Sequence, residues 1–182
     1  MARIEQVKRE NLNARQQQLY DGIMRTRPRG TLSGPFSVLI HTPEIAEPAD
    51  GLANCFRVNP KLDRRLIELI VLLMCRSATV KYAWSVHEPL ARQAGLAVQT
   101  IDAIRARKRP DFARDDERLI YDLVTELLTT KRVSDETFAR AQAALGRDGV
   151  IEAVSCAGFY GMIGFVLNAF EVPPQPGGEV LT

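Results

Sequence analysis

The sequence is poor in the residues that build metal sites and disulfide frameworks. Among its 182 residues it has only two histidines and three cysteines, Cys55, Cys75 and Cys156, which form no CxxC pair. Two histidines without clustered carboxylates argue against a zinc site. An odd number of cysteines without a secretion signal predicts reduced thiols. We therefore expect no metal site and no disulfides.

An excess of charge and long apolar runs are also lacking. The formal net charge is only +2, so electrostatics predict no nucleic-acid partner and no membrane partner. The apolar run Leu69–Cys75 is far shorter than the roughly 20 residues that cross a bilayer. The first nine residues already carry Arg3, Glu5, Lys8 and Arg9, unlike a signal peptide. The expected location is therefore the cytoplasm.

Helical periodicity runs through most of the chain. Apolar residues make up 46% and charged residues 25%, as in an ordinary globular domain. Residues 115–130 are amphipathic, and residues 151–170 are apolar on nearly all sides, as in a central helix or one beneath a subunit interface. We predict one all-α domain of about seven or eight helices. Its parts are an N-terminal helical arm and loop at 1–40, a helical domain at 41–172 and a mobile tail at 173–182.

Caps and helix breakers give the predicted helix boundaries. Residues 27–35 contain two prolines and two glycines, which is typical of a loop. Asn59 is predicted to cap the next long helix, with Pro60 at its first position. Gly146 is predicted to separate two helices near the C-terminus.

One carboxylate, Glu68, interrupts the otherwise apolar segment 66–75. A buried carboxylate has to be paired or protonated, because an isolated charge in an apolar interior is costly. Arg64 and Arg65 precede it by four and three residues and are able to pair with it on the helix surface. This local pairing is the structural alternative to a catalytic role.

His87 lies on the following predicted helix, three residues after the only tryptophan, Trp84. Histidine, Trp84 and Tyr82 at this spacing also occur in ordinary cores. The short connection at 77–80 predicts antiparallel packing of the two helices, which brings Glu68 and His87 to similar heights. A carboxylate that orients an imidazole is a common acid–base device. We therefore identify Glu68 and His87 as candidate catalytic residues.

Several segments in combination resemble the carboxymuconolactone decarboxylase and alkyl hydroperoxidase D superfamily. The core of the resemblance is Arg-Leu-Ile-Glu-Leu at 65–69 and Tyr-Ala-Trp-Ser-Val-His at 82–87, followed by Ala91 and Gly95-Leu96. Flanking segments at 34–36, 41–44, 158–162 and 167–170 resemble the lead-in and the final helix of longer members. The resemblance covers about residues 34–172. It implies an AhpD-like helical fold and self-association to a trimer or hexamer.

The hydroperoxidase branch of this superfamily places a CxxC motif between the glutamate and the histidine. The corresponding positions are Val80 and Ala83, and a dithiol peroxidase needs one sulfur to attack and another to resolve. The CxxC mechanism is therefore excluded. A peroxiredoxin-like antioxidant that uses one cysteine is an alternative, although the apolar setting of Cys75 disfavours its thiolate.

The decarboxylase branch lacks the CxxC, and the sequence resembles this branch more closely. The resemblance implies a cofactor-free lyase or proton-transfer enzyme that acts on a small unsaturated lactone or organic acid, with His87 as acid and base and Glu68 orienting it. An arginine is expected to anchor the substrate carboxylate. The expected substrate-binding residues are Tyr82, Trp84, Arg76, Arg65 and His41.

The N-terminal arm departs from the compact decarboxylases, which leaves the substrate open. A second alternative is a non-catalytic oligomeric binding module, in which Glu68 only pairs with Arg64.

Overall fold

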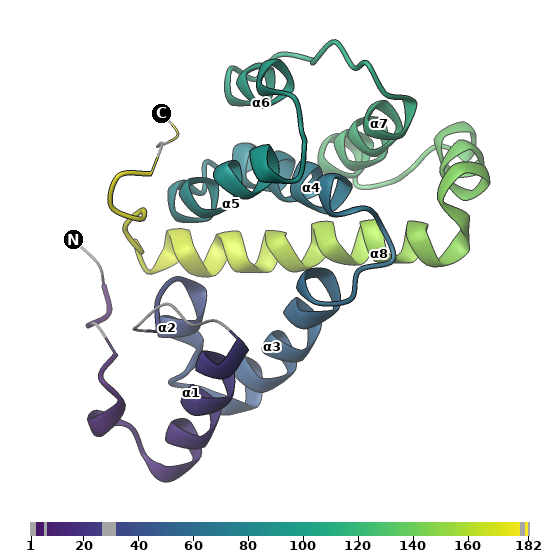
Figure 1. Ribbon diagram of the computed structural model, residues 1–182. Coiled ribbons are helices and arrows are strands. Elements are labelled where there is room, and N and C mark those ends of the chain that lie inside the picture. Colours follow the sequence, from purple (N-terminus) through teal and green to yellow (C-terminus); the bar gives the residue numbers. More distant parts are fainter. Residues whose placement is uncertain (1–2, 6, 27–31, 179–180, 182) are drawn as a thin grey trace.

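The computed structural model describes residues 3–5, 7–26, 32–178 and 181. Over these residues every regular element is a helix and none is a strand (Figure 1). The all-α prediction is therefore confirmed. In chain order the elements are η1 (Arg9–Asn11), α1 (Ala14–Thr26), α2 (Pro35–Leu39), α3 (Pro43–Arg57), α4 (Arg64–Ser77), α5 (Lys81–Gln93), α6 (Val98–Arg105), α7 (Asp115–Thr130) and α8 (Asp135–Ala169).

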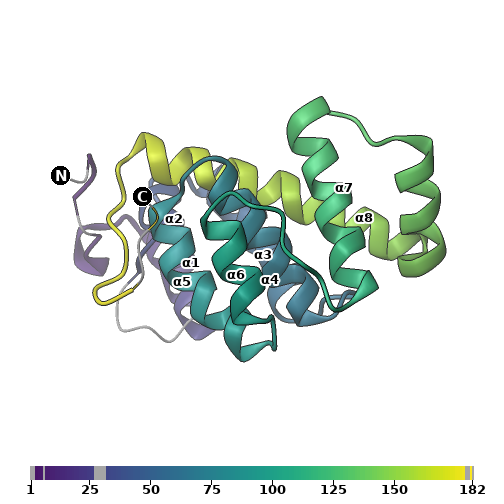
Figure 2. The ribbon, with the colours of Figure 1, turned by 90° about the horizontal axis from the view of Figure 1, so that it is seen from above.

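Helix α8 lies in the middle of the molecule. Helices α1, α2 and α3 lie on one side of it, and α4, α5, α6 and α7 lie on the other (Figure 1). Its main partners are α4 and α7, while α4 also packs against α5 and α6. Seen from above, α7 and the first part of α8 form one end of the molecule (Figure 2).

Helix α4 is the most buried element. Every residue from Arg65 to Leu73 is buried, because α5, α7 and α8 all pack against this helix. Each fully buried leucine or isoleucine contributes about 1.5–3 kcal/mol of transfer free energy. A polar residue on such a helix has no route to bulk water, which sets the conditions for Glu68.

The start of α4 differs from the prediction. Asn59 does not cap it, and Pro60 is not its first residue; the cap is Asp63, whose side chain accepts a hydrogen bond from the backbone N–H of Arg65. The preceding turn is held from elsewhere in the chain. The carboxylate of Glu152 on α8 accepts the N–H groups of Lys61 at 3.0 Å and Leu62 at 2.6 Å. The hydrogen-bond acceptor for this turn is thus a residue 90 positions away, whereas the sequence predicted that Pro60 begins the helix.

Gly146 breaks α8 as the sequence predicts. Its φ of 68° and ψ of 171° are non-helical, and the two helical segments join across it. A φ of this sign favours glycine, which has no side chain to clash. The predicted loop at 27–35 lies partly outside the described residues, and its described end, 32–34, leads into α2.

The second part of α8 corrects one sequence expectation. Residues 153–170 carry no charged side chain, so the chain does contain an uncharged, mostly apolar stretch much longer than Leu69–Cys75. By length and composition alone, α8 is able to cross a membrane, although 44% of its most apolar window is buried inside the molecule. Its packing against α4 and α7 is that of a central core helix.

The segment after α8 folds back against α5. The backbone N–H of Gln175 donates to Ser85 Oγ at 3.0 Å, and its side-chain amide donates to the Tyr82 hydroxyl at 2.8 Å. Leu181 is fully buried. We predicted a mobile tail for residues 173–182. Its described part contacts α5 through Gln175, and the sequence of the tail carries no signal for these partners.

The Glu152 contact gives a stability prediction. In Glu152→Ala the N–H groups of Lys61 and Leu62 lose their acceptor, and the loss of a buried acceptor costs about 1–3 kcal/mol per group. We expect the free energy of unfolding to fall by about 2–4 kcal/mol, measured by urea denaturation. The exposed Glu136 on the same helix provides the control, and Glu136→Ala should change stability by less than about 0.5 kcal/mol. Equal effects of the two variants would contradict this role of Glu152.

Candidate active site

Glu68 and His87 meet between α4 and α5. The Nδ1 atom of His87 lies 2.8 Å from Oε2 of Glu68, within hydrogen-bonding distance. The Glu68 side chain is completely buried, and 14% of the His87 side chain is exposed. Helices α4 and α5 pack together along their length, so the two residues contact each other although they are 19 positions apart.

Arg64 is the third member of this charged group. Its Nη2 forms an ion pair with Oε1 of Glu68. Its Nη1 donates to the backbone carbonyls of Phe56 at 3.2 Å and Arg57 at 3.4 Å, at the C-terminal end of α3. The local pairing with Arg64 and the contact with His87 therefore exist together, one on each carboxylate oxygen.

The two partners determine the ionisation of Glu68. Burial acts to raise the pKa of its carboxyl group, because a buried charge loses its hydration. His87 and Arg64 act in the opposite direction and hold the pKa of Glu68 below its ordinary value. Glu68 is therefore a carboxylate at neutral pH, able to orient the imidazole and to stabilise a positive charge on it.

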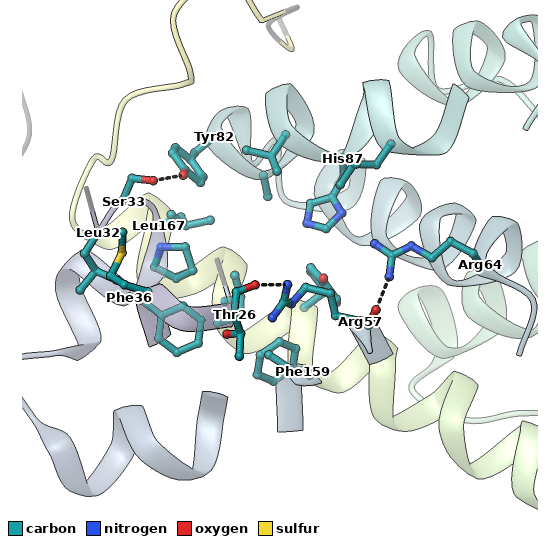
Figure 3. Close-up of a pocket in the computed structure, with 18 residues that line it drawn as sticks. Thr26, Leu32, Ser33, Phe36, Arg57, Arg64, Tyr82, His87, Phe159 and Leu167 are labelled. Carbon is teal, nitrogen blue, oxygen red and sulfur yellow. Dashed lines mark hydrogen bonds between the residues drawn. The ribbon is translucent and has the colours of Figure 1, made fainter. Parts of the chain in front are cut away.

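His87 forms part of the wall of a cavity of about 400 Å³ (Figure 3). Since Nδ1 faces Glu68, Nε2 is the ring nitrogen that remains for a ligand. Most of the cavity wall is apolar or aromatic, and its members come from α1, α2, α3, α4, α5, α8 and the loop before α2. The apolar lining residues are Met24, Leu32, Pro35, Phe36, Ala53, Ala83, Val86, Leu90, Phe159, Ile163 and Leu167.

The charged groups of the cavity are concentrated at one end. Arg57 and Arg64 lie beside His87 there, and Arg57 donates to the carbonyl of Thr26 at 2.9 Å (Figure 3). No aspartate or glutamate is among the described residues that line the cavity. A cavity with two guanidinium groups and no carboxylate in its wall suits an anionic ligand.

Tyr82 lines the opposite end. Its hydroxyl lies 3.1 Å from Ser33 Oγ and accepts a hydrogen bond from Gln175 (Figure 3). Beyond Tyr82 lies a second cavity of about 460 Å³ between the loop before α2, residues 4–5 and the segment 172–176. Tyr82 therefore separates two cavities.

Two of the predicted substrate-binding residues are held in structural contacts away from the cavity. Trp84 is completely buried and is absent from the cavity wall; the guanidinium carbon of Arg105 lies 5.6 Å from its ring centroid. Arg65 is buried and forms ion pairs with Asp116 at 2.7 Å and Glu117 at 2.6 Å. These contacts with α7 and α6 hold both side chains on sides of their helices that do not line the cavity.

Arg76 and His41 also lie outside the cavity wall. Burial lowers the pKa of Arg76, and repulsion from Arg107 adds to this. His41 is an exposed residue just after α2. Of the seven predicted site residues, the structure thus places His87 and Tyr82 in the cavity wall, with Glu68 directly behind His87.

Sequence analysis missed Arg57, Phe159 and Tyr160 as site residues, and it assigned Arg64 only a pairing role. Arg64 had a usable signal, since it precedes Glu68 by one helical turn. Tyr160 and Phe159 belong to a segment that resembles the family's final helix, but their place in the wall depends on how α8 packs against α5.

The two thiols nearest the charged group are poor nucleophiles. Cys75 and Cys156 are buried, and burial, together with the charge of Glu68, raises the pKa of both thiols far above the ordinary value. Cys55 is exposed. No group of three or more His, Cys, Asp or Glu side chains in the described part of the chain is placed to hold a metal ion.

Comparison with known proteins identifies solved structures that have the same fold. No protein-family model matches the sequence, and no curated protein matches it. Among solved structures, an uncharacterized peroxidase-related protein from Ralstonia eutropha JMP134 with an alkylhydroperoxidase AhpD core is similar. It has a TM-score of 0.78 and 14% identity over 96% of this chain and 93% of that one.

Two further solved structures are similar over most of their length. The debrominase Bmp8, in a cysteine-to-alanine variant bound to 2,3,4-tribromopyrrole, has a TM-score of 0.73 and 16% identity over 94% of this chain and 90% of that one. A peroxidase-related protein from Silicibacter sp. TM1040 has a TM-score of 0.72 and 14% identity over 96% of this chain and 89% of that one. At these identities the likeness establishes the fold, and the chain therefore has the AhpD-like helical fold.

Proposed function

We propose that this protein is a cofactor-free lyase or proton-transfer enzyme that acts on a small unsaturated lactone or organic acid. The observation that carries the proposal is the hydrogen bond of His87 to the buried Glu68 carboxylate at the wall of a cavity. An acid–base histidine needs a fixed ring, a partner for its charge and access to a ligand. All three conditions are met at His87.

His87 moves the proton in this proposal. Loss of carbon dioxide, or removal of a proton next to a carbonyl, leaves an electron pair that is delocalised into the carbonyl group. In a decarboxylation, the imidazolium form of His87 delivers a proton from Nε2 to the carbon that loses carbon dioxide. In a proton transfer, neutral Nε2 first takes the proton from the substrate and then returns it to another carbon. In both cases Glu68 holds Nδ1 and offsets the positive charge. The apolar wall keeps water away and strengthens these electrostatic interactions.

Arg57 and Arg64 anchor the substrate carboxylate, in place of the Arg65 and Arg76 that the sequence suggested. Both line the charged end of the cavity next to His87. Arg65 already has two carboxylate partners. A guanidinium group binds a carboxylate through two parallel hydrogen bonds, which also fixes the orientation of the substrate.

Replacement of His87 tests the proposal. We expect His87→Gln to lower turnover of unsaturated lactone acids by at least about 100-fold, because the proton donor is lost. Decay of the conjugated substrate absorbance across a panel of such acids measures the rate. The other histidine, exposed His41, provides the matched control, and His41→Gln should keep full activity.

The fold of each histidine variant is checked by circular dichroism and thermal unfolding. Full activity in a folded His87→Gln variant would overturn the proposal.

A one-cysteine antioxidant is the competing function, since two of the similar structures are described as peroxidase-related. The raised pKa of Cys75 and Cys156 disfavours it, because the thiolate is the reactive form. We expect alkylation by iodoacetamide to modify Cys55 in the native protein and the other two only after unfolding, as read by mass spectrometry. Rapid native alkylation of Cys75 or Cys156 would revive the antioxidant function.

Self-association to a trimer or hexamer is also part of the proposal. Helix α8 exposes an uncharged apolar stripe at helical spacing that includes Ile151, Val154, Met162 and Phe165, whose exposed fraction reaches 73%. Such a stripe is typical of a subunit interface. We expect Phe165→Asp to reduce the molar mass measured by light scattering, whereas Val98→Asp, at an exposed position at the start of α6, should not. A wild type that is monomeric would contradict this part.

A further inference from the structure

Tyr160 is a polar cavity residue for which the proposed reaction has so far given no role. It lies on α8 and lines the cavity beside His87. The two ring centroids are 5.1 Å apart, and the rings meet edge to face at 88°. Its ring also packs edge to face against Phe159, at 5.4 Å. Tyr160 is therefore held rigidly next to the imidazole.

The hydroxyl group of Tyr160 is a ready hydrogen-bond donor. Within the described residues it makes no hydrogen bond, in contrast to the Tyr82 hydroxyl, which contacts Ser33 and Gln175. The contact of its ring with His87 places Tyr160 at the end of the cavity where His87 and Arg64 contact Glu68. Burial, followed by the nearby Cys156 and Glu68, raises the pKa of Tyr160, so the phenol keeps its proton.

The proposed chemistry requires such a donor. When the bond to carbon dioxide or to the departing proton breaks, its electron pair moves into the substrate carbonyl and the oxygen becomes an enolate. His87 is engaged at carbon, and Arg57 and Arg64 are engaged at the carboxylate. A donor placed where charge develops contributes strongly to catalysis in a water-excluded site.

We propose that Tyr160 is a further catalytic residue, whose hydroxyl donates a hydrogen bond to the substrate carbonyl oxygen as it becomes an enolate. This inference rests on the proposed function of the same site. Tyr160 keeps its proton throughout. In a decarboxylation His87 supplies the proton that ends on carbon and regains one from solvent, whereas in a proton transfer it returns the proton that it took from the substrate. The substrate class is thereby narrowed to compounds that have a carbonyl conjugated with the bond that breaks.

The inference is tested by binding, without knowledge of the substrate. The para-nitrophenolate ion resembles an enolate in size and charge, and its visible absorbance changes when it is bound. Nitrobenzene has the same ring and lacks the oxyanion. Titrations of the wild type, Tyr160→Phe and Tyr121→Phe with each probe, at a pH where the phenol is ionised in solution, measure the dissociation constants. Tyr121 on α7 is the control, because its ring packs on Phe112 and is not part of the cavity wall.

We expect Tyr160→Phe to weaken nitrophenolate binding by about 10- to 100-fold, the range for a hydrogen bond to a charged group. Nitrobenzene binding should stay unchanged, and Tyr121→Phe should behave like the wild type with both probes. Equal nitrophenolate affinity in the wild type and Tyr160→Phe would overturn the inference, as would a wild type that does not bind the ion. Loss of affinity for both probes in Tyr160→Phe would also overturn it, because packing would then explain the effect.

The His87→Gln variant separates this inference from the proposed function. It keeps the Tyr160 hydroxyl, so it should bind nitrophenolate more tightly than Tyr160→Phe does. If Tyr160→Phe loses nitrophenolate binding and His87→Gln keeps full activity, the oxyanion site stands and the proposed lyase chemistry falls. If His87→Gln loses activity and Tyr160→Phe binds normally, the chemistry stands and the role of Tyr160 falls.

Discussion

The burial of one carboxylate governs the design of this site. Glu68 lies on the most buried helix of the molecule, where an uncompensated charge costs several kcal/mol, far more than a single surface ion pair returns. Two partners meet this requirement, and they come from different directions. Arg64 ties the carboxylate to the end of α3, and His87 ties it to α5. The same contacts that make the buried charge tolerable also fix the imidazole at the cavity wall.

The helical class, the break at Gly146 and the pairing of the α4 and α5 segments could be predicted from the sequence. These features depend on local signals in the sequence. The signals are apolar periodicity, a glycine between two helical segments, and the polar residues Glu68 and His87 on successive helices. The start of α4 could not be predicted, because Glu152 on α8 holds the turn at Lys61 and Leu62, so that the cap falls on Asp63 and not on Asn59. A helix boundary that depends on a partner 90 residues away has no local signature.

The choice of arginine and aromatic residues shows the same limit. Arg64 and Arg65 are adjacent in the sequence, but successive residues of a helix are rotated by about 100°. Arg64 therefore faces the cavity, whereas Arg65 faces α7, where Asp116 and Glu117 hold it. Likewise, Tyr82 and Trp84 are two positions apart on α5, yet Tyr82 lines the cavity and Trp84 does not. Which side of α4 and α5 faces a cavity depends on where α7 and α8 pack. That packing is decided by the apolar faces of all the helices together, which no single segment of the sequence reveals.

The position of α8 in the chain also has a consequence for folding. Glu68, Arg64 and His87 lie within 24 consecutive residues, so the charged group is able to assemble once α4 and α5 form. Phe159, Tyr160 and Ile163, which close the cavity, arrive only when α8 docks from far along the chain. Contacts at such sequence separation slow folding relative to simple helical bundles. A folding intermediate that contains α4 and α5 would thus hold the histidine and its carboxylate without an enclosed cavity, so acid–base groups and substrate binding are acquired at separate stages.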